Sequence, residues 1–312
     1  MISRVISLIN CPGVNGTMRF PRTTLMCVTL ALGGCATAPL EQAGSLRSYD
    51  RMSDADGLVT RSKIRVNKKD VLAAKTIRIA STVFPARADV PLNEKERRRV
   101  ANAISRELCL RLSERFRIVA ADEDADLTVQ ATVTHAAPTS PTAAGASKAL
   151  AIAKTVALPG VPVPVPRLPV GLGSLSVEAE AHDFAGFEKA AMVWARGANS
   201  ITNSPRVANE GDAYDLAADF GTDFAKLVAT GESPFGGVPA LPPMDSIRVR
   251  LGGAPKYVAC EAFGRFPGVT GLAGQGLGLP PGWTDSGAKE SPANGSIAPP
   301  VHEASPEQTL TQ

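Results

Sequence analysis

Residues Asp126–His135 read DLTVQATVTH and give the clearest structural signal in this 312-residue chain. Apolar and polar side chains alternate along the whole stretch, which is the pattern of a β-strand with one buried face. The side chains expected to face the core are Leu127, Val129, Ala131 and Val133, and those expected to face outward are Thr128, Gln130, Thr132 and Thr134.

Similar period-two patterns predict further strands on both sides of this one. They cover Thr76–Phe84, Phe116–Val119, Leu175–Phe184 and Phe187–Ile201, and Gly186 supplies the turn that makes the last two a hairpin.

Helical patterns lie between the predicted strands. Asn93 and Glu96 form a capping box, and Val100, Ile104, Leu108 and Leu112 then repeat every fourth residue. A second apolar face, Leu216, Phe220, Phe224 and Leu227, predicts a helix over Asp212–Thr230 that ends at Gly231. The small, alanine-rich stretch Thr142–Leu158 is a third predicted helix.

This order of elements predicts a single α+β domain, a mostly antiparallel sheet covered by helices on one face. The domain is expected over residues 61–232, followed by a Gly/Pro-rich, irregular and partly disordered tail over 233–312, with little fixed structure from Gly268 onward. The strand residues Ile77, Ile79, Leu127, Val129, Val133, Leu175 and Val177 are expected to pack against Val100, Ile104, Leu108, Phe220 and Phe224.

The first part of the chain has the pattern of a lipoprotein signal. Arg19 and Arg22 precede a short apolar run that ends in Leu32-Gly33-Gly34-Cys35. We therefore expect residues 1–34 to be a signal peptide, Cys35 to carry the lipid, and residues 35–60 to be the anchor and tether. Tyr49 and Met52 indicate that part of this tether packs on the domain.

The net charge gives no support to a nucleic-acid partner. The formal charge is +3, and residues 1–34 contribute three arginines and no acid, so the mature chain is formally neutral. A nucleic-acid partner would require a clustered basic surface.

Two cysteines remain in the mature chain once Cys11 and Cys27 leave with the signal and Cys35 is acylated. Cys109 and Cys260 are an even pair, which an oxidising compartment would join; the alternative is two unrelated buried thiols. No cysteine or histidine spacing suggests a metal site, and we expect neither a metal nor a cofactor.

Residues 159–169 have proline at nearly every second position, which predicts an extended, polyproline-II-like loop. Such a loop is the best candidate for binding a partner, through Val163, Val165, Arg167 and Leu168. The alternative, which we favour, is that its apolar side chains simply pack on the domain.

Nothing in the sequence has the spacing of a catalytic site. His135 and His182 lie on polar strand faces, where a His/Glu cluster is conceivable, but a solvated polar face explains both. Gly171-Leu172-Gly173 leads into a strand, so it is not a phosphate-binding loop.

Three stretches together resemble a family of bacterial outer-membrane lipoproteins known only as a domain of unknown function, family 3313. They are the motif before Cys35, the segment Ala73-Ala74-Lys75-Thr76, and Val163–Trp194 with its runs Pro164-Val165-Pro166-Arg167 and Gly171–Ala179. The resemblance implies a compartment and a fold, and no catalytic residues.

We therefore expect a non-enzymatic lipoprotein of the outer membrane. Its domain would face the periplasm, and it would act as an adaptor or structural component of the envelope with an envelope protein or the cell wall as partner. The alternative is an envelope hydrolase or a module that binds a cell-wall ligand.

Overall fold

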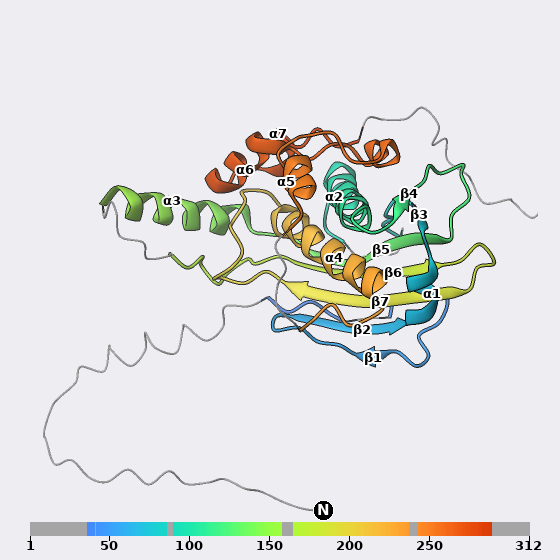
Figure 1. Ribbon diagram of the computed structural model, residues 1–312. Coiled ribbons are helices and arrows are strands. Elements are labelled where there is room, and N and C mark those ends of the chain that lie inside the picture. Colours follow the sequence, from blue (N-terminus) through green and yellow to red (C-terminus); the bar gives the residue numbers. More distant parts are fainter. Residues whose placement is uncertain (1–35, 41, 86–89, 158–164, 237–241, 289–312) are drawn as a thin grey trace, which may run out of the picture. The chain divides into compact units, whose positions relative to one another are not determined.

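The computed structural model describes residues 36–40, 42–85, 90–157, 165–236 and 242–288, which belong to one compact unit (Figure 1). Residues 1–34 and Cys35 lie outside the described part, so the structure leaves the expected signal peptide and lipidation site as predictions. Among the helices in the described ranges, none is long and apolar enough to cross a membrane.

A seven-stranded sheet in the order β1-β2-β7-β6-β5-β3-β4 forms the centre of the described part. Pairing is antiparallel except where β3 lies parallel to β4 and β5. The strands are β1 (Ser53–Asp54), β2 (Thr60–Val66), β3 (Thr76–Ile79), β4 (Arg117–Ile118), β5 (Leu127–Ala137), β6 (Ser174–His182) and β7 (Glu188–Gly197).

The two long helices α2 and α4 cover one face of this sheet, as Figure 1 shows. The helices are α1 (Lys68–Ala73), α2 (Glu94–Leu112), α3 (Pro141–Ala157), α4 (Gly211–Thr230), α5 (Met244–Arg250), α6 (Gly268–Leu277) and α7 (Pro281–Thr284). The predicted α+β class, the capping box at Asn93 and the end of α4 at Gly231 are confirmed.

The predicted core is also confirmed. All of the strand and helix residues expected to meet in it are buried in one hydrophobic cluster. The largest buried side chain, Trp194, packs edge-on against Phe220 with ring centroids 5.6 Å apart. The period of two in the strands and of 3.6 in the helices is therefore sufficient to identify the side chains that pack between the sheet and the helices.

The opposite face of the sheet is covered over β6 and β7, which corrects our expectation of a solvated face there, whereas Gln130 of β5 is exposed. The first described residues, 36–40 and 42–52, run across it; we call them the N-terminal strap. Leu46 packs against Ala191 and Val193, with Leu40, Tyr49 and Met52 around them. The strap therefore lies on the sheet and does not extend freely as a tether.

Buried carboxylates hold the strap in place. Glu178 accepts hydrogen bonds from the backbone N–H of Ala43 at 2.7 Å and from the Tyr49 hydroxyl at 2.8 Å. The Arg47 guanidinium contacts Glu180 at 3.2 Å. A carboxylate tolerates burial when donors satisfy it, which is why these two glutamates lie under the strap.

The segment after α4 forms short helices up to residue 284, where we expected little fixed structure. Cys109 of α2 and Cys260 of a 3-10 turn (Val258–Phe263) form the predicted disulfide, with Cα atoms 5.8 Å apart. Arg106 of α2 also pairs with Asp285, from Nη2 to Oδ2 at 2.6 Å, and both side chains are buried. Covalent and ionic bonds to α2 thus replace the apolar area that this segment lacks.

Candidate functional site at one end of the sheet

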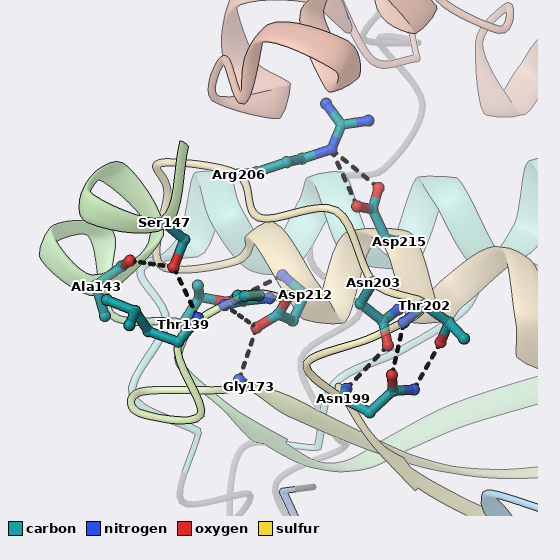
Figure 2. Close-up of polar contacts among 12 residues, drawn as sticks. Thr139, Ala143, Ser147, Gly173, Asn199, Thr202, Asn203, Arg206, Asp212 and Asp215 are labelled. Carbon is teal, nitrogen blue, oxygen red and sulfur yellow. Dashed lines mark hydrogen bonds and ion pairs between the residues drawn. The ribbon is translucent and has the colours of Figure 1, made fainter. Parts of the chain in front are cut away.

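The described part of the proline-rich segment, residues 165–169, lies at the end of the sheet where β5 stops, β6 starts and β7 stops. Between β5 and β6 the chain forms α3 and then returns through residues 165–173. Figure 2 shows the polar contacts that fix this return.

Arg167 is the centre of these contacts. Its Nη1 and Nη2 atoms donate to Oδ1 and Oδ2 of Asp212 at 2.5 and 2.9 Å, and both side chains are almost fully buried. Asp212 stands in the first turn of α4, where a negative charge is favoured by the helix dipole. Such a bidentate geometry fixes the guanidinium firmly, so Arg167 holds the loop to the core.

Asp212 also fixes the start of β6. Its Oδ2 accepts the backbone N–H of Gly173 at 2.7 Å, and its own N–H donates to Thr139 Oγ1 at 2.9 Å. A Cβ on Gly173 would lie 2.9 Å from the Ala137 oxygen and from atoms of Asp212 and Thr139. The glycine is therefore required by close packing, which accounts for part of the Gly171-Leu172-Gly173 run.

Ser147 joins the return to α3. Its hydroxyl donates to the Ala143 carbonyl at 2.7 Å and accepts the backbone N–H of Leu168 at 3.1 Å. On the other side, the Arg167 N–H donates to the Ser200 carbonyl at 2.8 Å. The return is thus bound to both α3 and the turn after β7.

The turn after β7 is closed by asparagine side chains, as Figure 2 shows. Asn199 Oδ1 accepts the N–H of Thr202 at 2.7 Å, and Asn203 Oδ1 accepts the N–H of Asn199 at 3.0 Å. This arrangement holds Ile201 at the tip of the turn, where 84% of it is exposed.

A second ion pair lies one turn further along α4. Arg206 Nε donates to both oxygens of Asp215, at 2.9 and 3.2 Å, and its guanidinium lies over the Tyr214 ring at 5.4 Å. Burial raises the pKa of Asp215 to about 6, although Arg206 opposes the shift. The Val207 N–H donates to the Gly278 carbonyl at 2.8 Å, so this pair lies beside the carboxy-terminal helices.

The predicted binding residues of the loop have different environments. Val163 lies outside the described residues, Val165 is half-buried, Arg167 is buried, and Leu168 is 39% exposed. The contacts of Arg167 are those of a packed residue, whereas Leu168 reaches the surface. Binding of a partner by this loop stays a prediction.

Sequence reasoning missed Asp212, Thr139 and Ser147. Arg167 and Asp212 are 45 residues apart, and no local spacing links them. The available signal was an arginine inside an apolar, proline-rich run, since a buried guanidinium requires an acceptor.

The two strand histidines do not form a cluster. β5 and β6 are neighbours, but His135 pairs with Ser176 and His182 pairs with Thr128, at opposite ends of the two strands. Burial lowers the pKa of His182, followed by the effect of Arg47. Within the part of the chain that the structure describes, no group of three His, Cys, Asp or Glu side chains could hold a metal ion.

Charged side chains do gather in one cavity of about 180 Å³, between α2, α4 and the carboxy-terminal helices. They are already paired: Arg250 contacts Glu107, Arg206 contacts Asp215, and Arg106 contacts Asp285. Groups that neutralise one another are poorly placed to act on a bound molecule.

The model of the family "Protein of unknown function (DUF3313)" matches residues 41–224, from the strap to the middle of α4. The chain belongs to this family. The matched region contains the strap from residue 42 onward, the sheet, Arg167 and Asp212, so the sheet end described above lies within the family domain. No curated protein matches the chain.

Two solved structures are similar in part. The PelC dodecamer from Paraburkholderia phytofirmans has 9% identity and a TM-score of 0.33, over 55% of this chain and 97% of that chain. A dodecamer of a PelC point variant from the same organism has 12% identity and a TM-score of 0.28, over 54% and 97%. With TM-scores below 0.5, we infer nothing about this chain from them.

Proposed function

We propose that this DUF3313 protein is a non-enzymatic outer-membrane lipoprotein, anchored through Cys35, whose domain faces the periplasm. It acts as an adaptor or structural component of the envelope and binds an envelope protein through the loop around Leu168. The sequence before Cys35 and the disulfide, which forms in oxidising compartments, support the location.

The end of the sheet is the observation that carries this proposal. Its charged groups are bonded to one another, as in Arg167–Asp212 and Arg206–Asp215, while the side chains that reach the surface beside them are apolar. Exposed apolar side chains on a rigidly held loop suit binding, whereas catalysis needs polar groups free to meet a substrate.

Lipidation is tested first, in cells fed a radiolabelled fatty acid. The parent chain should incorporate label and fractionate with outer membranes, and Cys35→Ser should block both, whereas globomycin, which inhibits the peptidase that removes the signal, should stop maturation and leave a labelled precursor. Cys27→Ser, a thiol substitution eight residues earlier, is the matched control and should leave labelling intact. Labelling that persists in the Cys35→Ser chain would contradict the anchor.

Partner binding is tested by placing a photo-crosslinking amino acid at Leu168 and, as control, at Phe184. Phe184 is 93% exposed in the turn between β6 and β7, at the other end of the sheet. A discrete protein adduct from position 168 alone supports the adaptor. Release of muropeptides from purified cell wall by the purified protein would favour the hydrolase alternative.

A further inference from the structure

Helix α3 has an unusual distribution of apolar side chains. Its first half is packed: Ala144 and Ser147 are buried, and Lys148 Nζ donates to the Gly276 carbonyl at 2.9 Å. Its second half, residues 149–157, carries Leu150, Ile152 and Val156 at 51, 54 and 77% exposure. Figure 1 shows α3 extending beyond the sheet at the end where β7 finishes.

The apolar side chains of this second half do not lie on one face. At 3.6 residues per turn, Leu150 and Ile152 point in nearly opposite directions, and the other positions of this half are four alanines, Thr155 and Lys154, whose long side chain can extend to the lipid headgroups. A groove on a protein partner or on a second copy would cover one stripe of such a helix. A lipid phase surrounds a helix on all sides.

The charge of the sequence around α3 also favours a lipid surface as the binding partner of this half-helix. From Leu127 to Val177 the sequence contains no aspartate or glutamate, so no carboxylate of this segment opposes an anionic lipid surface.

The position of the proposed anchor gives an independent argument. The N–H of Ala36, the residue after Cys35, donates to the Ala198 carbonyl at 3.0 Å, immediately after β7. The strap therefore leaves no slack between the acylated residue and this end of the sheet. Ile201, exposed in the adjacent turn, lies at the same end.

We propose that the second half of α3, with Ile201 beside it, inserts into the membrane surface as a second contact next to the lipid. This inference rests on the proposed anchor at Cys35 for its orientation. Nine helical residues rise about 13 Å, which reaches into one leaflet and is too short to span a bilayer. The loop at Leu168 would then meet its partner at the membrane surface.

The test uses the mature chain, residues 35–312, with Cys35→Ser, which removes both the signal peptide and the acyl chain, and vesicles of phosphatidylethanolamine and phosphatidylglycerol. Ile152→Trp reports insertion through quenching by brominated lipid chains, and Phe184→Trp is the matched control, since it is exposed at the other end of the sheet. The unsubstituted chain gives the background of Trp194 and Trp283. Quenching and a blue shift at position 152 alone are expected.

A second variant separates insertion from folding. Ile152→Asp should lower vesicle partitioning about tenfold or more, because burial of an isoleucine is lost, while Phe184→Asp leaves it unchanged. Both side chains are exposed, so both variants should melt like the parent. Absence of quenching at position 152 would overturn the proposal. A photo-crosslinking amino acid at position 152 that joins a second copy or another protein, in place of quenching, would do the same. Fatty-acid labelling of the unaltered chain tests the anchor separately.

Discussion

Two buried arginine–aspartate pairs hold two peripheral segments to the core, and they differ in what supports them. Arg167 joins the loop after α3 to Asp212 of α4, and Asp285 joins the carboxy-terminal segment to Arg106 of α2. Only the second segment is also held by a disulfide, Cys109–Cys260.

The difference shows how each segment compensates for a small apolar contact. The loop depends on charge and on hydrogen bonds that Ser147 and Ser200 accept, within the family domain. The carboxy-terminal segment has a covalent bond near its middle, and its ion pair fixes only the part beyond it. In both cases removal of the mate leaves the partner on the long helix without its counter-charge, so the cost in stability depends on whether water can reach that partner.

Without the disulfide both segments would depend on an ion pair and hydrogen bonds. Its removal should lower the free energy of unfolding more than substitution of Arg167 or Asp285. The bond closes a loop of 151 residues, so Cys109→Ala with Cys260→Ala should lower the free energy of unfolding by about 5 kcal/mol in the chain-entropy model. Urea denaturation of the variant and of the reduced parent measures this loss. Equal stability of the oxidised and reduced parent would contradict it.

Arg167→Ala should cost about 3–5 kcal/mol, because it leaves the Asp212 carboxylate buried without its cation. Arg167→Lys keeps the charge but loses the bidentate geometry, and its loss should be intermediate. Arg265→Ala is the control, since Arg265 and Glu261 form an exposed pair. A loss no larger than that of the control would mean that Arg167 does not hold the loop.

Asp285→Ala should cost less, about 1–3 kcal/mol, because the segment beyond Cys260 can move away and let water reach Arg106. Limited proteolysis should show new cleavage after residue 264 while α2 and α4 stay protected. With the disulfide also removed, the protected core should end near residue 232. Cleavage within α4 in the single variant would argue against independent release.

The smallest expected effect is on the pH dependence of stability. It compares Asp223, which accepts a hydrogen bond from Trp194, with Asp285, which forms an ion pair with Arg106. Burial raises the pKa of Asp223 to about 6, although Trp194 Nε1 donates to it at 2.9 Å. Its contribution to stability is present below about pH 4 and lost as the pH rises through 6. Asp223→Asn keeps the acceptor and should add on the order of 1–2 kcal/mol at pH 7 and nothing at pH 4.

Asp285 should behave in the opposite way. Burial acts to raise its pKa, but the hydrogen bonds from Arg106 and Tyr214 hold it below its usual range. Its contribution is therefore present above the usual carboxyl pKa and lost as the pH falls through the lower value. Urea titrations between pH 3 and 7 give the free energy of unfolding as a function of pH. Relative to the parent, Asp223→Asn should gain stability toward pH 7, and the deficit of Asp285→Ala should shrink toward pH 3. Curves parallel to that of the parent would contradict both pKa shifts.

The parts of the fold that were predictable from sequence are those with strong local periodicity. β5, β6, β7, α2 and α4 follow their patterns, and the two cysteines left after the expected processing indicated the disulfide. β2 was missed because Thr60–Val66 is polar at most positions and obtains its place by pairing with β7.

The remaining errors concern contacts between distant residues. Alternation in β6 shows that Glu178 faces away from the helices, but it carries no information on whether another part of the chain covers that face. Likewise, glycine and proline in the carboxy-terminal segment predict little structure by themselves, and bonds to Arg106 and Cys109 are what hold it. At the sheet end, Asp212 could be found only through the fold that brings it to Arg167.

The strap also determines the order in which the molecule can be completed. Ala43 and Glu178, which it joins, are 135 residues apart, so at 5–20 residues per second Glu178 is synthesised roughly 7–27 s later. Until then the strap lacks Glu178 and β2 lacks β7, and the apolar side chains of the strap stay in solvent. The strap is thus made before the strands that it covers and can fold only after them.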